Sequence, residues 1–487
     1  MNKKTFPPEF IKFIILVLIS IGTTYSGSDM VSSLWYIGML VWYYLSKNEA
    51  FWAAYFLVTV DGFMSVLGLY SATISILPGL PGVEVAQFYI ALTIIKATFQ
   101  QSSVRIFFKN FLRIMFFYAA FLIVYGQLTG FGGETKEYFR IFKLTLPLLL
   151  LYSLPRLIRN FEDYEFLMGY IFLVMILGFI TQISSLLFHF APSNYLVIRP
   201  QEEEESEIFR TFYNTAITLM SMFGATFFMN FSGRNYFSSR YLNIVLLSAF
   251  GMALLSATRG WILSFGFIMI MNFTVINRVN PRRLAGFVIA LALLLVIGLS
   301  NEKVKEQIDY SIERFETLEA LIGGDVTAEG TLQRLDERGP RVMNQFEKSP
   351  VIGFGYSNIY KDYHDSHVGN QNILLYSGII GMALIAGFLL FICLVFLQRY
   401  FKSPANSIYR KPYLTFVVFL LGWFMLHSSS GQQFGFLGLP VQMLPQAIFF
   451  SMAVMFYNLE HKAETERAMA YYLARRNSLQ KMQVPEH

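Results

Sequence analysis

Residues 330–381 read GTLQRLDERGPRVMNQFEKSPVIGFGYSNIYKDYHDSHVGNQNILLYSGIIG and mark the switch from a polar loop to an apolar run. They close the only long polar segment that lies between apolar runs of the chain. Arg334, Arg338 and Arg341 are spaced i, i+4 and i+7, so a helix through this stretch would carry them on one face. Such a stripe is either a solvated helix face or a clamp for an anion.

The composition of the whole chain excludes a soluble globular domain. Hydrophobic residues make up 55% of the chain and charged residues only 14%, with a positive mean hydropathy of +0.47. The single cysteine, Cys393, lies in an apolar run, which excludes a disulfide framework and a multi-cysteine metal site. The composition therefore predicts an all-α polytopic membrane protein.

Apolar runs long enough to cross about 30 Å of hydrocarbon, at about 1.5 Å per residue, recur from end to end. We predict spans at 9–26, 31–46, 51–72, 83–100, 111–130, 140–156, 165–190, 209–231, 241–257, 260–277, 284–300, 370–398, 413–428 and 439–457. The expected total is about fourteen transmembrane helices, within a range of about twelve to fourteen because several runs are short. The predicted organisation is eleven helices in 1–300, a large helical loop in 301–370, three helices in 371–458 and a polar tail in 459–487.

The distribution of lysine and arginine predicts the orientation. With a cytoplasmic N-terminus, most lysines and arginines fall in cytoplasmic segments, and the short outward loops hold only Lys136, Arg140, Lys143, Arg199, Arg210 and Arg259. This asymmetry is the positive-inside pattern. It puts both termini in the cytoplasm and the loop 301–370 outside, which in a bacterium with two membranes is the periplasmic side of the inner membrane.

His367 is the candidate base of the loop, because imidazole exchanges protons near neutral pH. The alternative is a loop histidine bonded to backbone. His364 stands three residues earlier, and with Asp365 the run HDSH resembles half of a metal site. No further ligand cluster in the outward loops completes such a site, so we predict no metal and no cofactor.

Two further groups of residues are candidates for substrate contact. Arg259 stands at the outward end of a predicted span, and an arginine at membrane level is costly unless it pairs or lines a polar cavity. Because guanidinium groups bind phosphate with two parallel hydrogen bonds, the arginines together could hold a pyrophosphate. Tyr356, Tyr360 and Tyr363 are also spaced i, i+4 and i+7, and they either stack on sugar rings or form an interfacial aromatic belt.

The order of these motifs resembles the superfamily of O-antigen ligases and Wzy-type O-antigen polymerases. The shared order is an outward Arg-Gly at 259–260, a large outward loop with an arginine-bearing helix, SPVIGFGY at 349–356, a loop histidine, and GIIG at 378–381. The resemblance covers roughly residues 210–400. The usual His-Asn pair of the family reads His367-Val368 here, so His364 and His367 both remain candidates for the family histidine.

The resemblance implies a GT-C-like membrane glycosyltransferase that takes a glycan from an undecaprenyl-pyrophosphate carrier. Attack on the anomeric carbon needs a deprotonated acceptor hydroxyl and stabilisation of the departing pyrophosphate. His367 would supply the base, with Arg259 and Arg334 as the other catalytic residues and Arg338 and Arg341 beside them. The implied partners are the lipid-linked donor, a glycan or lipid acceptor and the bilayer, and no nucleic acid.

Three other functions remain open on the sequence. A ligase would transfer the glycan to lipid A core or another acceptor instead of to a second lipid-linked unit. A transporter or flippase for lipid-linked sugars also has many spans, but it usually binds its substrate near the midplane of paired repeats, and no repeat is evident here. A structural membrane subunit would leave the arginine stripe unexplained.

Overall fold

The computed structural model describes the helical body of the chain and part of the loop 301–370. The described residues are 7, 9–24, 28–60, 73–74, 83–100, 102, 104–130, 144–187, 215–231, 237–255, 259–277, short pieces between 285 and 309, 337–365, 368–429, 434–436 and 440–482. Within them the structure is helical apart from two short antiparallel strands, β1 (Thr73–Ile74) and β2 (Val83–Glu84). The prediction of an all-α protein is confirmed.

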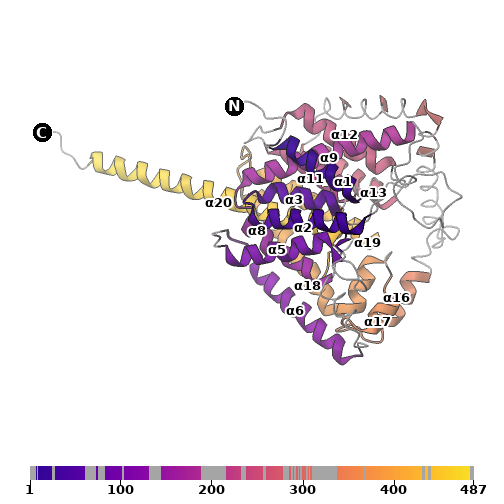
Figure 1. Ribbon diagram of the computed structural model, residues 1–487. Coiled ribbons are helices and arrows are strands. Elements are labelled where there is room, and N and C mark those ends of the chain that lie inside the picture. The colour runs from indigo at the N-terminus through magenta and orange to yellow at the C-terminus, as the bar shows by residue number, and fades with distance from the viewer. Residues whose placement is uncertain are drawn as a thin grey trace.

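Fifteen α-helices make up the described body (Figure 1). They are α1 (Phe10–Thr24), α2 (Asp29–Leu45), α3 (Glu49–Val60), α5 (Val85–Phe99), α6 (Lys109–Leu128), α8 (Leu150–Leu157), α9 (Phe161–Leu187), α11 (Thr215–Asn230), α12 (Ser239–Leu255), α13 (Arg259–Met271), α16 (Gly339–Phe346), α17 (Asn358–Tyr363), α18 (Gly369–Lys402), α19 (Arg410–Ser429) and α20 (Pro440–Met482). A 3₁₀ turn, Leu146–Leu149, precedes α8, and a π-helical turn, Asn272–Ile276, follows α13.

Thirteen of the fourteen predicted spans overlap a described helix in whole or in part, and 284–300 is described only at scattered positions. The overlap is partial for 51–72, where α3 is described to Val60, and for 140–156, where α8 begins at Leu150, so the full set of fourteen spans is not shown. Among the described residues, three helices are long and apolar enough to cross a membrane: Lys109–Leu128, Phe161–Ser184 and Gly369–Lys402. These three indicate a membrane protein. Helix α20 runs without a break through residue 458, where we predicted the last span to give way to the tail.

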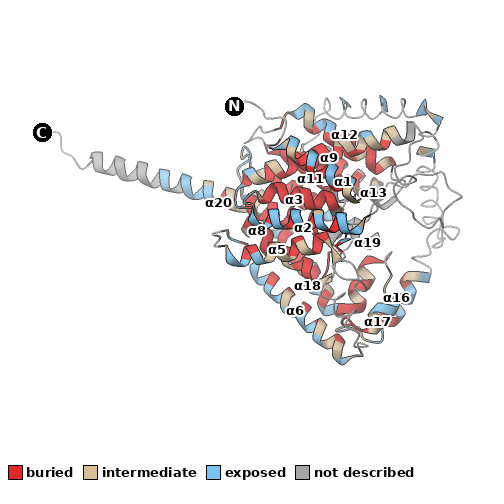
Figure 2. Ribbon diagram, viewed as in Figure 1, coloured by how far each residue is buried: buried red, intermediate tan, exposed pale blue. Residues whose placement is uncertain are grey.

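The burial pattern separates an inner group of helices from an outer one (Figure 2). Residues 50–59 of α3 are all buried, as expected for a helix that is apolar on every side. On the outer helix α6, by contrast, large apolar side chains point away from the body, and Phe117 and Leu128 are 78% and 81% exposed. Apolar side chains exposed on this scale need an apolar surrounding, which a bilayer provides.

Helix α18 is broken at Gly378, where φ is +63° inside an otherwise helical run. A continuous helix would join the N–H of Ile379 to the carbonyl of Leu375, and that of Ile380 to Tyr376. The break leaves these four groups without helical partners. In an apolar surrounding each unpaired backbone group costs several kcal/mol, so other parts of the chain have to bond them.

The segment 350–355 supplies those partners. The Ile379 and Ile380 N–H groups donate to the carbonyls of Pro350 (2.9 Å) and Val351 (3.2 Å). In return, the N–H groups of Phe354 and Gly355 donate to the Leu375 and Tyr376 carbonyls, both at 2.9 Å. The next carbonyl, that of Ser377, accepts a 2.6 Å hydrogen bond from the Tyr118 hydroxyl of α6. Backbone hydrogen bonds therefore join the segment 350–355 to both sides of the break in α18.

The two backbones approach so closely that only glycine fits at the crossing. A Cβ on Gly378 would lie 2.3 Å from the Val351 oxygen, and one on Gly353 would lie 2.7 Å from the Gly378 nitrogen. Both residues also have positive φ, at +63° and +76°. The sequence motifs IGFGY and SGIIG thus meet in space because each provides a backbone without a side chain.

We expect Gly378→Ala to lower the free energy of unfolding by roughly 1–3 kcal/mol, because the new Cβ meets backbone atoms that cannot move aside and φ is positive. Gly387→Ala is the matched control on the same helix, since its Cβ would meet only Phe111 at 3.9 Å. Thermal unfolding of both variants in detergent measures the difference. Equal stability of the two variants would contradict the described crossing.

Candidate functional site

The candidate site lies at the N-terminal end of α18, where α16 and α17 pack (Figure 1). Helix α16 begins at Gly339-Pro340, and proline is well suited to a first turn because its missing N–H has no partner there. Its buried side chains Val342 and Phe346 face the body, and Val342 packs with Val368 and Leu375 of the following segment. This apolar contact fixes α16 on α18 and leaves Arg341 of α16 exposed, while Arg338, the residue before the helix, is half-buried.

Arg338 and Arg341 converge on one carboxylate. The Arg338 Nη1 lies 3.8 Å from Oδ1 of Asp365, and the Arg341 Nη2 lies 3.5 Å from Oδ2. The arginine side chains are 36% and 50% exposed, while that of Asp365 is only 13% exposed. Exposed ion pairs of this kind add little to stability. Each guanidinium keeps further N–H donors that can bind an anion, and the two arginines carry one charge more than Asp365 neutralises.

Asn372 holds Asp365 in place. The buried Asn372 amide, in the first turn of α18, accepts from the Asp365 N–H at 3.0 Å and donates to the Asp365 carbonyl at 2.5 Å. The carboxylate that the arginines approach is thus tied to the start of the membrane helix. Our reading of the sequence missed Asn372 and this role of Asp365. A polar side chain at the start of an apolar span was the available signal.

His364 ends α17 with a defined ring orientation. Its Nδ1 lies 2.8 Å from the carbonyl oxygen of Lys361. A carbonyl can only accept, so Nδ1 carries the hydrogen, and in the neutral ring Nε2 is left as the acceptor. The Tyr360 ring lies beside the imidazole, with centroids 5.3 Å apart. His364 therefore has the tautomer that a general base needs.

The three tyrosines do not share one helix, because α17 begins after Tyr356. Tyr356 is buried, and its ring lies 5.6 Å from that of Tyr376. Burial raises the pKa of the Tyr356 phenol well above its ordinary value, so this residue stays neutral. Tyr360 also packs on Tyr376, at 5.3 Å, whereas Tyr363 is 36% exposed. Of the three, Tyr363 is the most accessible to a ligand.

The remaining predicted residues are only partly covered. His367 and Arg334 lie outside the described residues, and Arg259 is the first residue of α13 with its side chain outside the description. Within the part of the chain that is described, no group of three or more His, Cys, Asp and Glu could hold a metal ion. The alternative in which His364, Asp365 and His367 bind a metal stays untested, because His367 is outside that part.

The structure thus brings together Arg338, Arg341, Asp365 and His364 at one end of α18. Comparison with known sequences adds no family: no protein-family model and no curated protein matches the chain.

Proposed function

We propose that this protein is a membrane glycosyltransferase that transfers or polymerises glycan from an undecaprenyl-pyrophosphate-linked donor at the periplasmic face of the inner membrane. The observation that carries the proposal is the convergence of Arg338 and Arg341 on Asp365, beside His364, on a loop bonded into a membrane helix. The proposal includes a GT-C-like arrangement of about twelve to fourteen spans and the motif order shared with O-antigen polymerases and ligases.

The chemistry assigns a different task to each group. The acceptor hydroxyl oxygen forms a bond to the anomeric carbon while the bond from that carbon to the pyrophosphate oxygen breaks. The hydroxyl proton goes to the imidazole of His367, with His364 as the alternative base. The arginines stabilise the charge that develops on the departing pyrophosphate. Asp365 keeps Arg338 and Arg341 oriented until the donor binds.

The position of the site at a membrane surface supports a lipid-linked donor. The part of α18 after the break at Gly378 runs from residue 379 to 402, and at about 1.5 Å per residue it is long enough to cross the hydrocarbon core. The arginine cluster around Asp365 lies just before the N-terminal end of α18, and the C-terminal end of α18 carries Arg399 and Lys402. A carrier lipid in the outer leaflet would present its pyrophosphate at the level of the first end.

The first prediction of this proposal concerns orientation. On a Cys393→Ala background, Asp362→Cys in α17 should react with an impermeant thiol reagent in intact cells, and Lys462→Cys in α20 should not. Both positions are exposed, so accessibility to the reagent depends on the side of the membrane. Labelling of residue 462 but not of residue 362 would reverse the topology and remove the periplasmic site.

The second prediction separates binding from proton transfer. Arg338→Ala with Arg341→Ala should weaken donor binding by about tenfold to a hundredfold, because charge-assisted hydrogen bonds to the anion are lost. Arg341→Lys should retain only part of the affinity, since lysine lacks the planar fork. His367→Ala should leave donor binding nearly unchanged and lower turnover by about 10² to 10⁴.

Lys348→Ala is the control for the loss of a positive charge from the same loop. Lys348 follows the C-terminal end of α16, away from Asp365, and its Nζ donates to the Gln345 side chain at 2.8 Å. His364→Ala decides between the two bases: a large loss of turnover there, with His367→Ala active, moves the base to His364. If the arginine and histidine variants all keep full binding and turnover, the loop is not the active site.

The third prediction distinguishes reaction classes. The purified protein, given a lipid-pyrophosphate glycan alone, should form a ladder of lengthened lipid-linked products. A single transfer that occurs only after addition of lipid A core would identify a ligase. Movement of the intact donor across a liposome membrane without a new glycosidic bond would identify a transporter and refute the enzyme proposal.

A further inference from the structure

The contact between Asp365 and the two arginines of the candidate site is loose. Each carboxylate oxygen of Asp365 faces one arginine, Arg338 Nη1 at 3.8 Å and Arg341 Nη2 at 3.5 Å. Both separations are longer than the roughly 2.7–2.9 Å of a charge-assisted hydrogen bond. The guanidinium groups are therefore not closed around the carboxylate, and an anion can bind them beside it.

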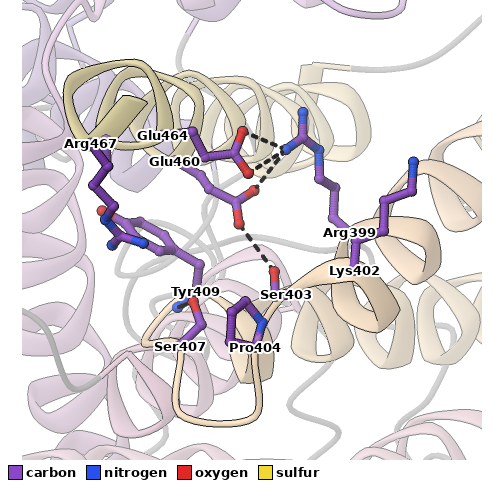
Figure 3. Close-up of a pocket in the computed structure, with 10 residues that line it drawn as sticks. Arg399, Lys402, Ser403, Pro404, Ser407, Tyr409, Glu460, Glu464 and Arg467 are labelled. Carbon is purple, nitrogen blue, oxygen red and sulfur yellow. Dashed lines mark hydrogen bonds and ion pairs between the residues drawn. The ribbon is translucent and has the colours of Figure 1, made fainter. Parts of the chain in front are cut away.

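The ion pairs at the opposite end of α18 have a different balance of charge (Figure 3). There Arg399 Nη1 lies 2.9 Å from Oε2 of Glu464 and 3.5 Å from Oε2 of Glu460, so one guanidinium serves two carboxylates. The Arg399 side chain is 22% exposed, against 36% and 50% for the two arginines of the candidate site. The candidate site thus combines an excess of cations with greater exposure, and both features suit a ligand that is an anion.

The main chain of Asp365 is fixed independently of its carboxylate. The Asn372 side chain accepts from the Asp365 N–H at 3.0 Å and donates to the Asp365 carbonyl, and neither bond uses the carboxylate. An anion that binds the remaining N–H groups of Arg338 and Arg341 therefore lies beside a negative charge whose main chain is held in place. The repulsion between the two depends on how many charges the anion carries.

The proposed reaction changes that number. In the donor both phosphates are diesters, and each carries one negative charge. When the bond from the anomeric carbon to the pyrophosphate oxygen breaks, its electron pair stays on that oxygen, and the hydroxyl proton of the acceptor goes to the base. The terminal phosphate of the product then carries about two charges at neutral pH. Two arginines alone would bind this product more tightly than the donor and delay its release.

We propose that Asp365 sets the preference of the site for the pyrophosphate diester of the donor over the more highly charged pyrophosphate that is released. The inference rests on the proposed glycosyltransferase function and gives Asp365 a task beyond the orientation of the arginines. Its charge repels the product more strongly than the donor, and its carboxylate takes the place of the product beside Arg338 and Arg341. Asp365 is thus a specificity-determining residue that acts through charge.

The test is a calorimetric titration of the detergent-solubilised full-length protein with two probes, geranyl pyrophosphate and the methyl ester of its terminal phosphate. The probes share the pyrophosphate and the apolar chain and differ by one charge. Asp365→Asn should raise the affinity for geranyl pyrophosphate by about tenfold and that for the methyl ester by about threefold, so the ratio of the two affinities should change by about threefold.

Two control variants separate charge from structure. Asp365→Glu keeps the charge and should keep the ratio of the wild type. Asp362→Asn removes an exposed carboxylate of α17 and should leave both affinities unchanged. The bonds to Asn372 use only the main chain of residue 365, so the asparagine variant retains them. If Asp365→Asn does not fold, Asp365→Ser replaces it.

The ratio of affinities decides the outcome. The inference is overturned if Asp365→Asn changes both affinities by the same factor or weakens both, because the carboxylate would then only orient the arginines. It is also overturned, together with the arginine site, if neither probe binds the wild type or if Arg338→Ala with Arg341→Ala leaves binding unchanged. A changed ratio without any glycosyl transfer from a lipid-linked donor would refute the glycosyltransferase alone, and the discrimination by charge would stand.

Discussion

The need to pair every backbone N–H and C=O in an apolar surrounding governs the position of the loop segment 350–355. The break at Gly378 interrupts the hydrogen bonds within helix α18. Backbone groups of the segment 350–355 form the replacement hydrogen bonds on both sides of the break. Because backbone atoms meet backbone atoms, this contact tolerates no side chain at the crossing. The segment 350–355 is therefore attached to α18 by a fixed set of backbone hydrogen bonds. The chain then returns to the same place, because α18 itself begins at Gly369.

This attachment explains why charged residues can be held at one point of a loop whose sequence is largely polar. Val342 anchors α16 against the start of α18, and Asn372 binds the backbone of Asp365 from the helix side. The arginines then approach a carboxylate whose position is set by the helix. In the proposed reaction such a fixed arrangement matters, because charge stabilisation is most effective when its donors need not reorganise. At the other end of α18 the charges are reversed: a single guanidinium, that of Arg399, pairs with the two carboxylates of Glu460 and Glu464.

Hydropathy was sufficient to predict an all-helical membrane protein, because long apolar runs recur along the chain and three of the described helices are long and apolar enough to cross a membrane. The sequence made Arg338, Arg341 and His364 candidates for substrate contact in one loop, but it did not predict that the two arginines meet at Asp365. It did not predict the break at Gly378, because the pattern of apolar residues continues through it. The burial of Tyr356 and the bonds from Asn372 to Asp365 were also missed, since each depends on a contact between segments that are separated along the chain. Regular spacing misled us for the tyrosines, because α17 begins only after Tyr356.

The position of bound undecaprenyl pyrophosphate is the most direct test of the central claim. We expect a structure determined with this lipid to put its phosphate oxygens within about 3 Å of the guanidinium nitrogens of Arg338 and Arg341. The first sugar of a bound donor should then lie beside the histidines of the same loop. Density for the pyrophosphate deep among the buried helices, away from the loop, would contradict the claim and favour a transporter.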